Sequence, residues 1–347
     1  MPEKILISGA AGFIAMHTIK RLLAAGHIVV GTVRDPDDAA KTAPLRAMPG
    51  AGARLSLVAA DLDAPDPFTT HADVDVIFHM ATPFAVDVDD PQRDLVDPAV
   101  DGTLAMMRAA AGNPRVRRVV LTSSMAAIMD EPGDQVISED TWNTSSSLTR
   151  NPYYYAKTLA ERAAWDFMSA GARNFDLVVL NPFIVIGPSH TATLNPSNAI
   201  LARIVNGGFP GILDLAWGFV DVRSVADAHV EAMRRPEAEG RHILAAQPIP
   251  MSEVCEIIAD LGYGANMRRL NLSGGLATSL IKLVSHTQPK GSGSYLRTHL
   301  GRMPKLDNTK SQRALGIDYG DPRVMIRDAI ADMARWGHID PAKASSI

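Results

Sequence analysis

A glycine-rich turn near the start of the chain constrains the fold more than any other feature. Residues 5–15 read Ile-Leu-Ile-Ser-Gly-Ala-Ala-Gly-Phe-Ile-Ala, so an apolar run passes through glycines into a helix-forming stretch. Such a turn lets the amides of a helix N-terminus approach the pyrophosphate of a dinucleotide, because a Cβ would block the approach. An ordinary strand-to-helix turn is the alternative interpretation. The turn residues expected at the cofactor are Gly9, Ala11, Gly12, Phe13 and Ile14.

The first half of the chain alternates short β-rich runs with amphipathic stretches. Strands are expected at 4–8, 28–33, 55–59, 74–79, 118–122 and 177–180, and helices near 13–25, 36–48, 94–112 and 153–171. Strands rich in Val, Ile and Leu that alternate with helices indicate right-handed crossovers and a parallel sheet buried on both faces. The sequence therefore predicts an α/β fold with a doubly wound parallel sheet, the Rossmann fold.

The pattern loosens after Gly187-Pro188. Segments 189–216 and 248–300 are richer in Asn, Ser, Gly and Pro, and residues 288–294 are expected to form a loop. We assign residues 1–187 and about 217–247 to a dinucleotide-binding domain. Residues 188–216 and about 248–347 are assigned to a smaller, interleaved substrate lobe. Ser224 followed by Asp227 predicts a helix start in the intervening part.

The end of the second strand indicates which dinucleotide is bound. Enzymes that use NAD place an acidic residue there to hold the ribose 2′-hydroxyl, but this strand ends Thr-Val-Arg34-Asp35-Pro. Arg34 can form charge-assisted hydrogen bonds to a 2′-phosphate, and Lys41 can add a second positive charge. Asp35 is expected to cap the next helix. NADP(H) is therefore the predicted cofactor, with a solvated surface arginine as the alternative.

Tyr153 and Lys157 carry the predicted chemistry. On a helix, residues four apart share a face, and a neighbouring ammonium lowers the pKa of a tyrosine so that it can exchange a proton with a reacting oxygen. The strand that ends near residue 122 is followed by Ser123 and Ser124, at the edge where doubly wound sheets bind ligands. Ser124 is the preferred residue to hold the substrate oxygen, with Ser123 in reserve.

Composition excludes several classes of function. The net charge of −4 gives no footprint for nucleic acid, and no apolar run reaches the length of a membrane span. Cys255 is the single cysteine, and the start of the chain passes directly into a strand, so a cytoplasmic protein without a signal peptide is expected. His17, His27, His71 and His79 lack ligand spacing, so no metal site is predicted, and His79 and His229 are interpreted as structural.

These motifs together resemble the extended short-chain dehydrogenase/reductase superfamily, also described as the NAD-dependent epimerase/dehydratase family. The similarity is strongest to its dihydroflavonol 4-reductase-like branch, which also holds cinnamoyl-CoA reductases and microbial aldehyde and ketone reductases. It runs nearly end to end. The matching segments are 9–14, 32–36, 61–62, 78–83, 101–103, 122–124, 153–161, 182–188, 219–223 and 307–310.

The resemblance implies roles for individual residues. Ser124, Tyr153 and Lys157 would be catalytic, and Arg34 and Lys41 would hold the 2′-phosphate of NADP. Asp61 and Leu62 would lie against adenine. The remaining cofactor contacts implied are Met80, Ala81 and Thr82 on the adenosine side, and Pro182, Ile184 and Val185 beside the nicotinamide. Hydride delivery to an aldehyde or ketone, giving an alcohol, is the implied reaction.

The substrate is constrained by one departure from the branch. Plant dihydroflavonol reductases carry an asparagine five residues after the catalytic serine, and this chain has Met129 there. Flavonoid reduction is therefore not expected, and an apolar or aromatic carbonyl compound is preferred. The candidate pocket residues are Phe84, Met125, Met129, Tyr154, Phe209 and Trp217, for which plain core packing is the alternative.

Other functions on the same fold remain open. Sugar-nucleotide epimerases usually carry Arg-x-x-Asn at the sixth strand, where this chain has Leu180-Asn-Pro-Phe. A steroid dehydrogenase-like enzyme is a further possibility, and a non-catalytic NADP-binding sensor is another, since fold alone does not fix function. The expected partner is a small carbonyl substrate, with the chain acting as a monomer or homodimer.

Overall fold

The chain is organised around one parallel β-sheet. The computed structural model describes residues 1–62, 64, 66–83 and 86–340. Within them a seven-stranded sheet has the order β12-β7-β5-β4-β1-β2-β3, and every neighbouring pair is parallel. Its strands are β1 (Lys4–Ile7), β2 (Ile28–Val33), β3 (Leu55–Ala59), β4 (Val76–His79), β5 (Arg118–Thr122), β7 (Asp176–Pro182) and β12 (Gly240–Leu244). The predicted Rossmann fold is confirmed.

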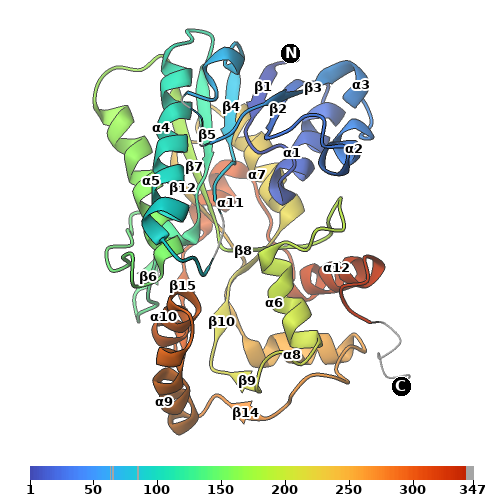
Figure 1. Cartoon of the computed structure of the whole chain (residues 1–347), viewed down its shortest axis with the longest axis vertical. Helices are drawn as coiled ribbons and strands as arrows, with labels where there is room; N and C mark the ends of the chain where they lie inside the picture. The colour runs from blue at the N-terminus through green and yellow to red at the C-terminus, as the bar shows by residue number, and fades with distance from the viewer. Residues whose placement is uncertain (63, 65, 84–85, 341–347) are drawn as a thin grey trace.

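Helices cover both faces of this sheet. On one face α1 (Phe13–Ala24) packs against α7 (Val222–Arg234), and on the other α4 (Asp97–Ala111) packs against α5 (Pro152–Ser169), as Figure 1 shows. The short helices α2 (Ala39–Arg46) and α3 (Ala51–Arg54) connect β2 to β3. The sheet is therefore buried on both sides, which accounts for strands that are apolar without alternation.

The second part of the molecule lies below the carboxyl ends of the strands in Figure 1. Its helices are α6 (Pro196–Val205), α8 (Met251–Asp260), α9 (Gly275–Val284), α10 (Lys290–His299) and α12 (Pro322–Arg335). Short strands pair as β8 (Ile184–Ile186) with β11 (Phe219–Asp221), β10 (Ala216–Trp217) with β13 (Ile249–Pro250), β9 (Ile212–Leu213) with β14 (Asn271–Leu272), and β6 (Val136–Ile137) with β15 (Lys305–Leu306). Helix α11 (Thr309–Leu315) contacts β12.

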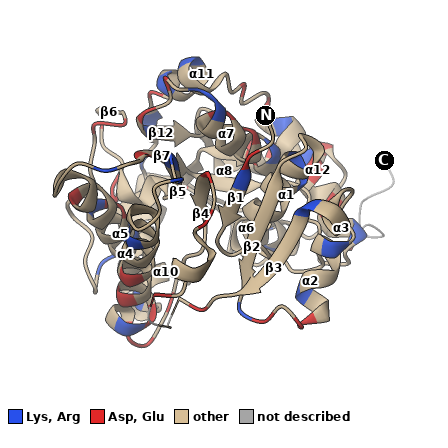
Figure 2. Cartoon of the chain, turned by 90° about the horizontal axis from the view of Figure 1, so that it is seen from above, with Lys and Arg blue, Asp and Glu red and all other residues tan. Residues whose placement is uncertain are grey.

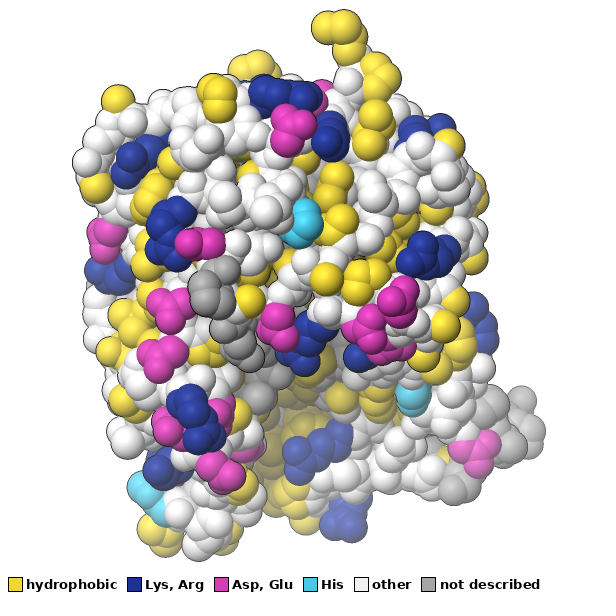
Figure 3. Space-filling model, turned by 45° about the horizontal axis from the view of Figure 1, so that its top comes forward, with side chains coloured by type: hydrophobic (Ala, Val, Ile, Leu, Met, Phe, Trp, Pro, Cys, Tyr) yellow, Lys and Arg dark blue, Asp and Glu magenta, His cyan; other side chains and the backbone are white. Residues whose placement is uncertain are grey.

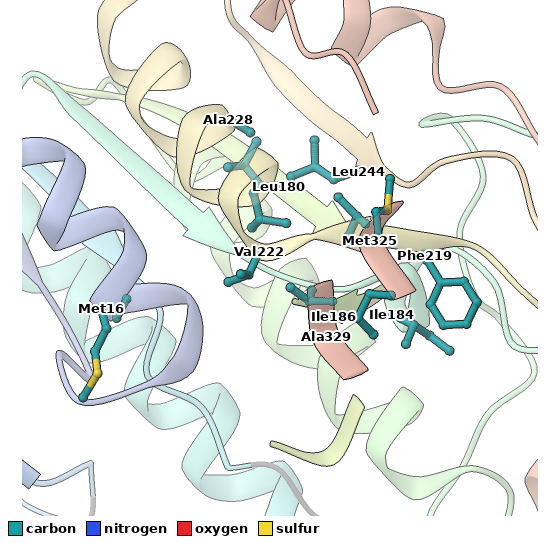
Figure 4. Packing of buried hydrophobic residues seen from close by; sticks show 14 of the residues in the cluster. Met16, Leu180, Ile184, Ile186, Phe219, Val222, Ala228, Leu244, Met325 and Ala329 are labelled. Atoms are coloured by element: carbon teal, nitrogen blue, oxygen red, sulfur yellow. The ribbon is translucent and has the colours of Figure 1, made fainter. Parts of the chain in front are cut away.

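One hydrophobic core joins the two parts. Figure 4 shows Leu180 and Leu244 from the sheet beside Ile184 and Ile186 of β8, with Met325 of α12 packed against them. All of these side chains are buried. Because the same cluster contains sheet and lobe residues, the lobe is fixed to the carboxyl edge of the sheet rather than tethered by a linker.

Three local expectations are wrong. Helix α2 is capped by Asp38, whose side chain accepts from the Lys41 amide, while the Asp35 carboxylate accepts from the amide of Asp37 instead. Helix α7 begins at Val222 and is capped by Asp221, two residues before the predicted start at Ser224. The predicted loop 288–294 is largely the first half of α10.

In the part of the chain that the structure describes, basic and acidic segments are interspersed in the view of Figure 2. Seen from above, they alternate around the rim of the fold in this figure. None of the helices in the described residues is long and apolar enough to cross a membrane.

Candidate active site

The glycine turn between β1 and α1 has the geometry that a nucleotide phosphate needs. Gly9 has φ +68°, and a Cβ there would lie 3.2 Å from Ala81. The Gly12 amide donates to the Gly9 carbonyl at 2.8 Å, and Gly12 precedes α1 in an extended conformation. Phe13 and Ile14 form the first turn of α1, where helix amides have no acceptor within the helix. The turn therefore fits a bound pyrophosphate.

The predicted phosphate-binding cations lie at the end of β2 and in α2. Arg34 is exposed immediately after β2, and among the described residues it has no hydrogen bond or ion pair. Lys41 is also exposed, and its ammonium lies 3.1 Å from the Asp38 carboxylate. Arg34 is thus free to meet a 2′-phosphate, whereas Lys41 already has an acidic neighbour.

The ends of β3 and β4 supply the other adenosine-side candidates. Met80 and Ala81 follow β4, and their amides both donate to the Ser8 hydroxyl at 2.9 Å, which holds them beside the glycine turn. Thr82 is half-buried next to them. Asp61 is exposed, while Leu62 packs so closely on α4 that a Cβ at Gly102 would lie 2.7 Å from it.

Helix α5 carries the predicted catalytic pair into the middle of the carboxyl edge. Its first turn follows Asn151, a buried residue in the left-handed conformation (φ 47°), and Pro152 occupies the first helical position. Tyr153 forms a side-chain hydrogen bond with Ser124, which lies just beyond β5. The ammonium of Lys157 donates to the Thr122 carbonyl at 3.4 Å. Strand β5 and helix α5 therefore bring all three predicted residues together.

Ser123 is not equivalent to Ser124. Its hydroxyl donates to the buried Glu161 carboxylate at 2.5 Å, whereas the Ser124 hydroxyl contacts Tyr153 and accepts from the Ala126 amide at 3.1 Å. Ser124 is therefore the serine that contacts Tyr153, and its role beside a reacting oxygen stays a prediction.

Burial dominates the electrostatics of this site. It lowers the pKa of Lys157 to about 8, while the nearby Glu161 carboxylate opposes that shift. Burial raises the pKa of Tyr153, which is opposite to the lowering expected from the Lys157 ammonium, while the hydrogen bond to Ser124 acts to lower it. Burial, together with the charge of Lys157, lowers the pKa of His79 to about 3, so that histidine is neutral. A small cavity beside Lys157 is lined in part by His79, Thr82, Thr122, Ser123 and Glu161.

The predicted structural histidines are satisfied within the core. His79 shares a 2.9 Å hydrogen bond with Ser8. His229 bonds to the Thr122 hydroxyl and to the Val225 carbonyl, each at 2.7 Å. Both side chains are buried, and both support strand ends that carry site residues.

The nicotinamide-side and pocket candidates are mostly buried. Pro182, Ile184 and Val185 lie where β7 passes into β8, and Met125 and Met129 pack with Ile243 in a separate apolar cluster. Trp217 is buried, Phe209 is half-buried beneath Arg203, and Tyr154 is half-buried. Phe84 lies outside the described residues. Their roles at the substrate stay predictions.

Sequence reasoning missed an aromatic group contributed by α10. Tyr295 stacks on His299 with ring centroids 4.0 Å apart, and its hydroxyl accepts from the Trp217 indole at 3.0 Å. Tyr154 contacts both rings edge-on and also lies beside Tyr153. A Gly- and Ser-rich stretch gives no helical signal, so Tyr295 could not be placed near the site. Figure 3 shows a face with mixed charges, hollowed below its middle, with hydrophobic side chains in the hollow.

Comparison with known proteins identifies the family of the chain. Residues 5–246 match the NAD dependent epimerase/dehydratase family. The chain belongs to this family, and the resemblance seen in its motifs is confirmed.

The chain is also similar to individual reductases. The chain is 38% identical to the cinnamoyl-CoA reductase CAD2 of Medicago truncatula over 266 residues, covering 74% of this chain and 80% of that one. It is 31% identical to a putative NADPH-dependent methylglyoxal reductase of Candida albicans, over 95% of this chain and 98% of the other. The crystal structure of yeast methylglyoxal/isovaleraldehyde reductase Gre2 complexed with NADPH superposes with a TM-score of 0.80 at 26% identity, covering 97% of this chain and 100% of Gre2.

Proposed function

We propose that this chain is an NADPH-dependent carbonyl reductase that converts an aldehyde or ketone into an alcohol. The observation that carries the proposal is the convergence of Ser124, Tyr153 and Lys157 at the carboxyl edge of the sheet, next to a glycine turn that fits a dinucleotide. The relatives support it, because they are named as reductases of carbonyl compounds and a solved neighbour holds NADPH.

Each catalytic side chain has a distinct task in this reaction. NADPH supplies the hydride to the carbonyl carbon when it is bound. The Ser124 hydroxyl donates a hydrogen bond to the carbonyl oxygen, which stabilises the charge that develops there. Tyr153 then transfers its phenolic proton to that oxygen, and the ammonium of Lys157 stabilises the phenolate that remains. Lys157 also forms a hydrogen bond to the nicotinamide ribose of the cofactor.

Cofactor choice follows from charge at the adenosine end. Arg34 is an exposed cation at the end of β2, where an acidic residue would repel a 2′-phosphate. Asp61, Leu62 and Met80 to Thr82 form the adenosine side, and Pro182, Ile184 and Val185 form the nicotinamide side. The sheet domain, residues 1–187 and about 217–247, holds the dinucleotide, and the remaining segments form the substrate lobe. An apolar or aromatic substrate fits the aromatic rings of Tyr154, Trp217 and Tyr295.

The single cysteine bears on where the enzyme is located in the cell. A cytoplasmic location fits a chain whose single cysteine, Cys255, is buried and unpaired. We expect a monomer or a homodimer.

The test is turnover by the full chain with NADPH and a panel of aromatic aldehydes, α-keto esters and aryl ketones, followed at 340 nm. Tyr153→Phe should lower kcat by at least ~1000-fold while NADPH still binds, because only the proton donor is lost. Tyr155→Phe is the matched control, since the neighbouring tyrosine lacks the four-residue spacing to Lys157. Tight NADPH binding without any turnover would contradict the proposal and favour a sensor.

A further inference from the structure

A buried carboxylate lies directly behind the catalytic residues. Glu161 follows Lys157 by one helical turn on α5, so Tyr153, Lys157 and Glu161 share one face of that helix. Its side chain is fully buried and lines the small cavity beside Lys157. Burying a carboxylate is costly unless it is paired and hydrogen-bonded, so its position calls for a physical reason.

Four donors surround this carboxylate. One oxygen accepts from the Arg241 guanidinium at 2.5 Å and from the Trp165 indole at 3.4 Å. The other accepts from the Ser123 hydroxyl at 2.5 Å and from the Asn181 side chain at 2.7 Å. These partners come from β12, α5, β7 and the end of β5. Glu161 therefore joins three neighbouring strands to the catalytic helix.

Arg241, the cationic partner of Glu161, is also fixed by several contacts. Arg241 is buried, donates to the carbonyls of Glu139 and Thr141 at 2.8 and 2.6 Å, and stacks over the Trp142 ring at 3.9 Å. A guanidinium tied in this way is pre-organised, so it holds the carboxylate in one position.

The contacts of Glu161 end on the backbone that carries Ser124. Ser123 is its immediate neighbour, and the Asn181 side chain that bonds Glu161 also donates to the Ser124 carbonyl at 3.2 Å. Movement of the carboxylate would therefore shift the peptide that presents the Ser124 hydroxyl to Tyr153.

We infer that Glu161 is a positioning residue of this active site, which fixes the Ser124 backbone through Ser123 and Asn181 and whose negative charge acts on the Tyr153–Lys157 pair. The inference deepens the proposed function and rests on it. It assigns Glu161 no contact with substrate or cofactor. Glu161 acts in two separable ways, through the position of Ser124 and through its charge on the Tyr153–Lys157 pair.

His79 lines the same small cavity as Lys157, and His229 bonds to Thr122, whose carbonyl accepts from Lys157. His79 and His229 are neutral above about pH 5, because burial lowers the pKa of His79 to about 3 and of His229 to about 4. Among these groups, Tyr153 and Lys157 are therefore the ones whose protonation changes near neutral pH or above. A negative charge raises the pKa of both, so its removal must lower the pH at which the pair loses a proton.

Reduction requires a protonated Tyr153, so kcat/KM should fall as pH rises through the pKa of the pair. Glu161→Gln should shift this alkaline limb to lower pH by about one unit. Glu161→Asp keeps the charge and should leave the limb near its original pH, although kcat falls. Ser123→Ala keeps the charge and removes one contact, so kcat should fall roughly 3- to 10-fold without any shift of the limb.

The matched control is Asp176→Asn. It removes the carboxylate partner of another buried arginine, Arg118, at the opposite end of β5, and should leave the limb unchanged. If Glu161→Gln does not fold, the double variant Glu161→Gln/Arg241→Met removes both buried charges and should still shift the limb downward, because Glu161 is the charged group that acts on the pKa of Lys157.

The outcomes separate the inference from the function on which it rests. A wild-type enzyme that is active and loses activity with Tyr153→Phe, but whose alkaline limb is unmoved by Glu161→Gln, overturns the charge part. Wild-type kcat and KM in Ser123→Ala overturn the positioning part. Absence of any turnover in the wild-type chain counts against the proposed function instead.

Discussion

The predicted cofactor side of the sheet and the predicted substrate lobe are specified by the sequence in different ways. On the cofactor side, strands β2 and β5 begin and end where their apolar runs do, and the turn after β1 needs glycine because Gly9 has φ +68°. In the lobe, α10 begins in a Gly- and Ser-rich stretch, and its N-terminal amides bond to Asp87 from a loop about 200 residues earlier. Local signals determine the first region, and distant contacts determine the second.

The largest effect of a single substitution is expected on the cofactor side, at Gly9. Gly9→Val should lower NADPH affinity by more than ~100-fold and unfolding free energy by about 2 kcal/mol, because the added Cβ meets Ala81 and the positive φ is strained. Fluorescence titration of NADPH and chemical denaturation measure the two effects. Gly133→Val is the control, since a Cβ there meets nothing within 4 Å. NADPH affinity that survives in Gly9→Val would show that the turn is not the phosphate site.

The adenosine end offers a cleaner test of local specification. Arg34→Asp should weaken NADPH by about 30-fold and leave NADH nearly unchanged, because the variant loses a charge-assisted contact and repels the 2′-phosphate. Dissociation constants for both cofactors measure the change. Lys20→Asp alters the net charge equally from an exposed position on α1 and should affect neither. Equal weakening of both cofactors by Arg34→Asp would remove the assignment to NADP(H).

Low pH should lower the free energy of unfolding through a buried histidine of the sheet region, His229. Burial lowers the pKa of His229 to about 4, while an unfolded histidine titrates near 6.5. Below pH 6.5 the unfolded chain therefore binds a proton that the folded chain refuses, and stability falls as pH falls toward 4.

The size of this effect can be isolated with one variant. Between pH 6.5 and 5 the contribution of His229 is about 2 kcal/mol, and His229→Gln should flatten the pH dependence of unfolding by that amount. Urea denaturation at several pH values measures it, with the half-exposed His71→Gln as control. An identical pH slope in the wild type and His229→Gln would contradict the burial argument.

The candidate site was predictable where chemistry follows sequence spacing. Tyr153 and Lys157 are one turn apart, and Ser124 follows a strand, so helix and sheet geometry bring them to one edge. Glu161 lies on the same helical face, but a carboxylate one turn beyond a lysine is also typical of an exposed helix. Its partner Arg241 is 80 residues away, and the pairing of β12 with β7 was needed to bring the two together.

Two other predictions failed because the local sequence is compatible with more than one structure. Asp35 and Asp38 are both acceptable helix caps, and the choice depended on where the chain leaves β2 after Pro36. Gly291 in α10 lies in the stretch predicted to be a loop, but glycine is required there because a Cβ would lie 1.8 Å from the Val86 carbonyl oxygen. Glycine indicated a close approach of two segments, which sequence alone cannot distinguish from a turn.

The smallest expected effect lies in the substrate lobe, where one hydrogen bond joins α10 to β10. Tyr295→Phe removes the acceptor of the Trp217 indole, which should lower unfolding free energy by about 1 kcal/mol because a mostly buried donor is left unpaired. The KM for aromatic carbonyl substrates should change several-fold, while the KM for NADPH stays the same, since Tyr295 contacts Tyr154 and not the glycine turn. Tyr263→Phe controls for the loss of a hydroxyl elsewhere in the lobe. If the KM for NADPH changed instead, α10 would belong to the cofactor side. The nucleotide site would then also depend on distant contacts, and the contrast between the two regions would not hold.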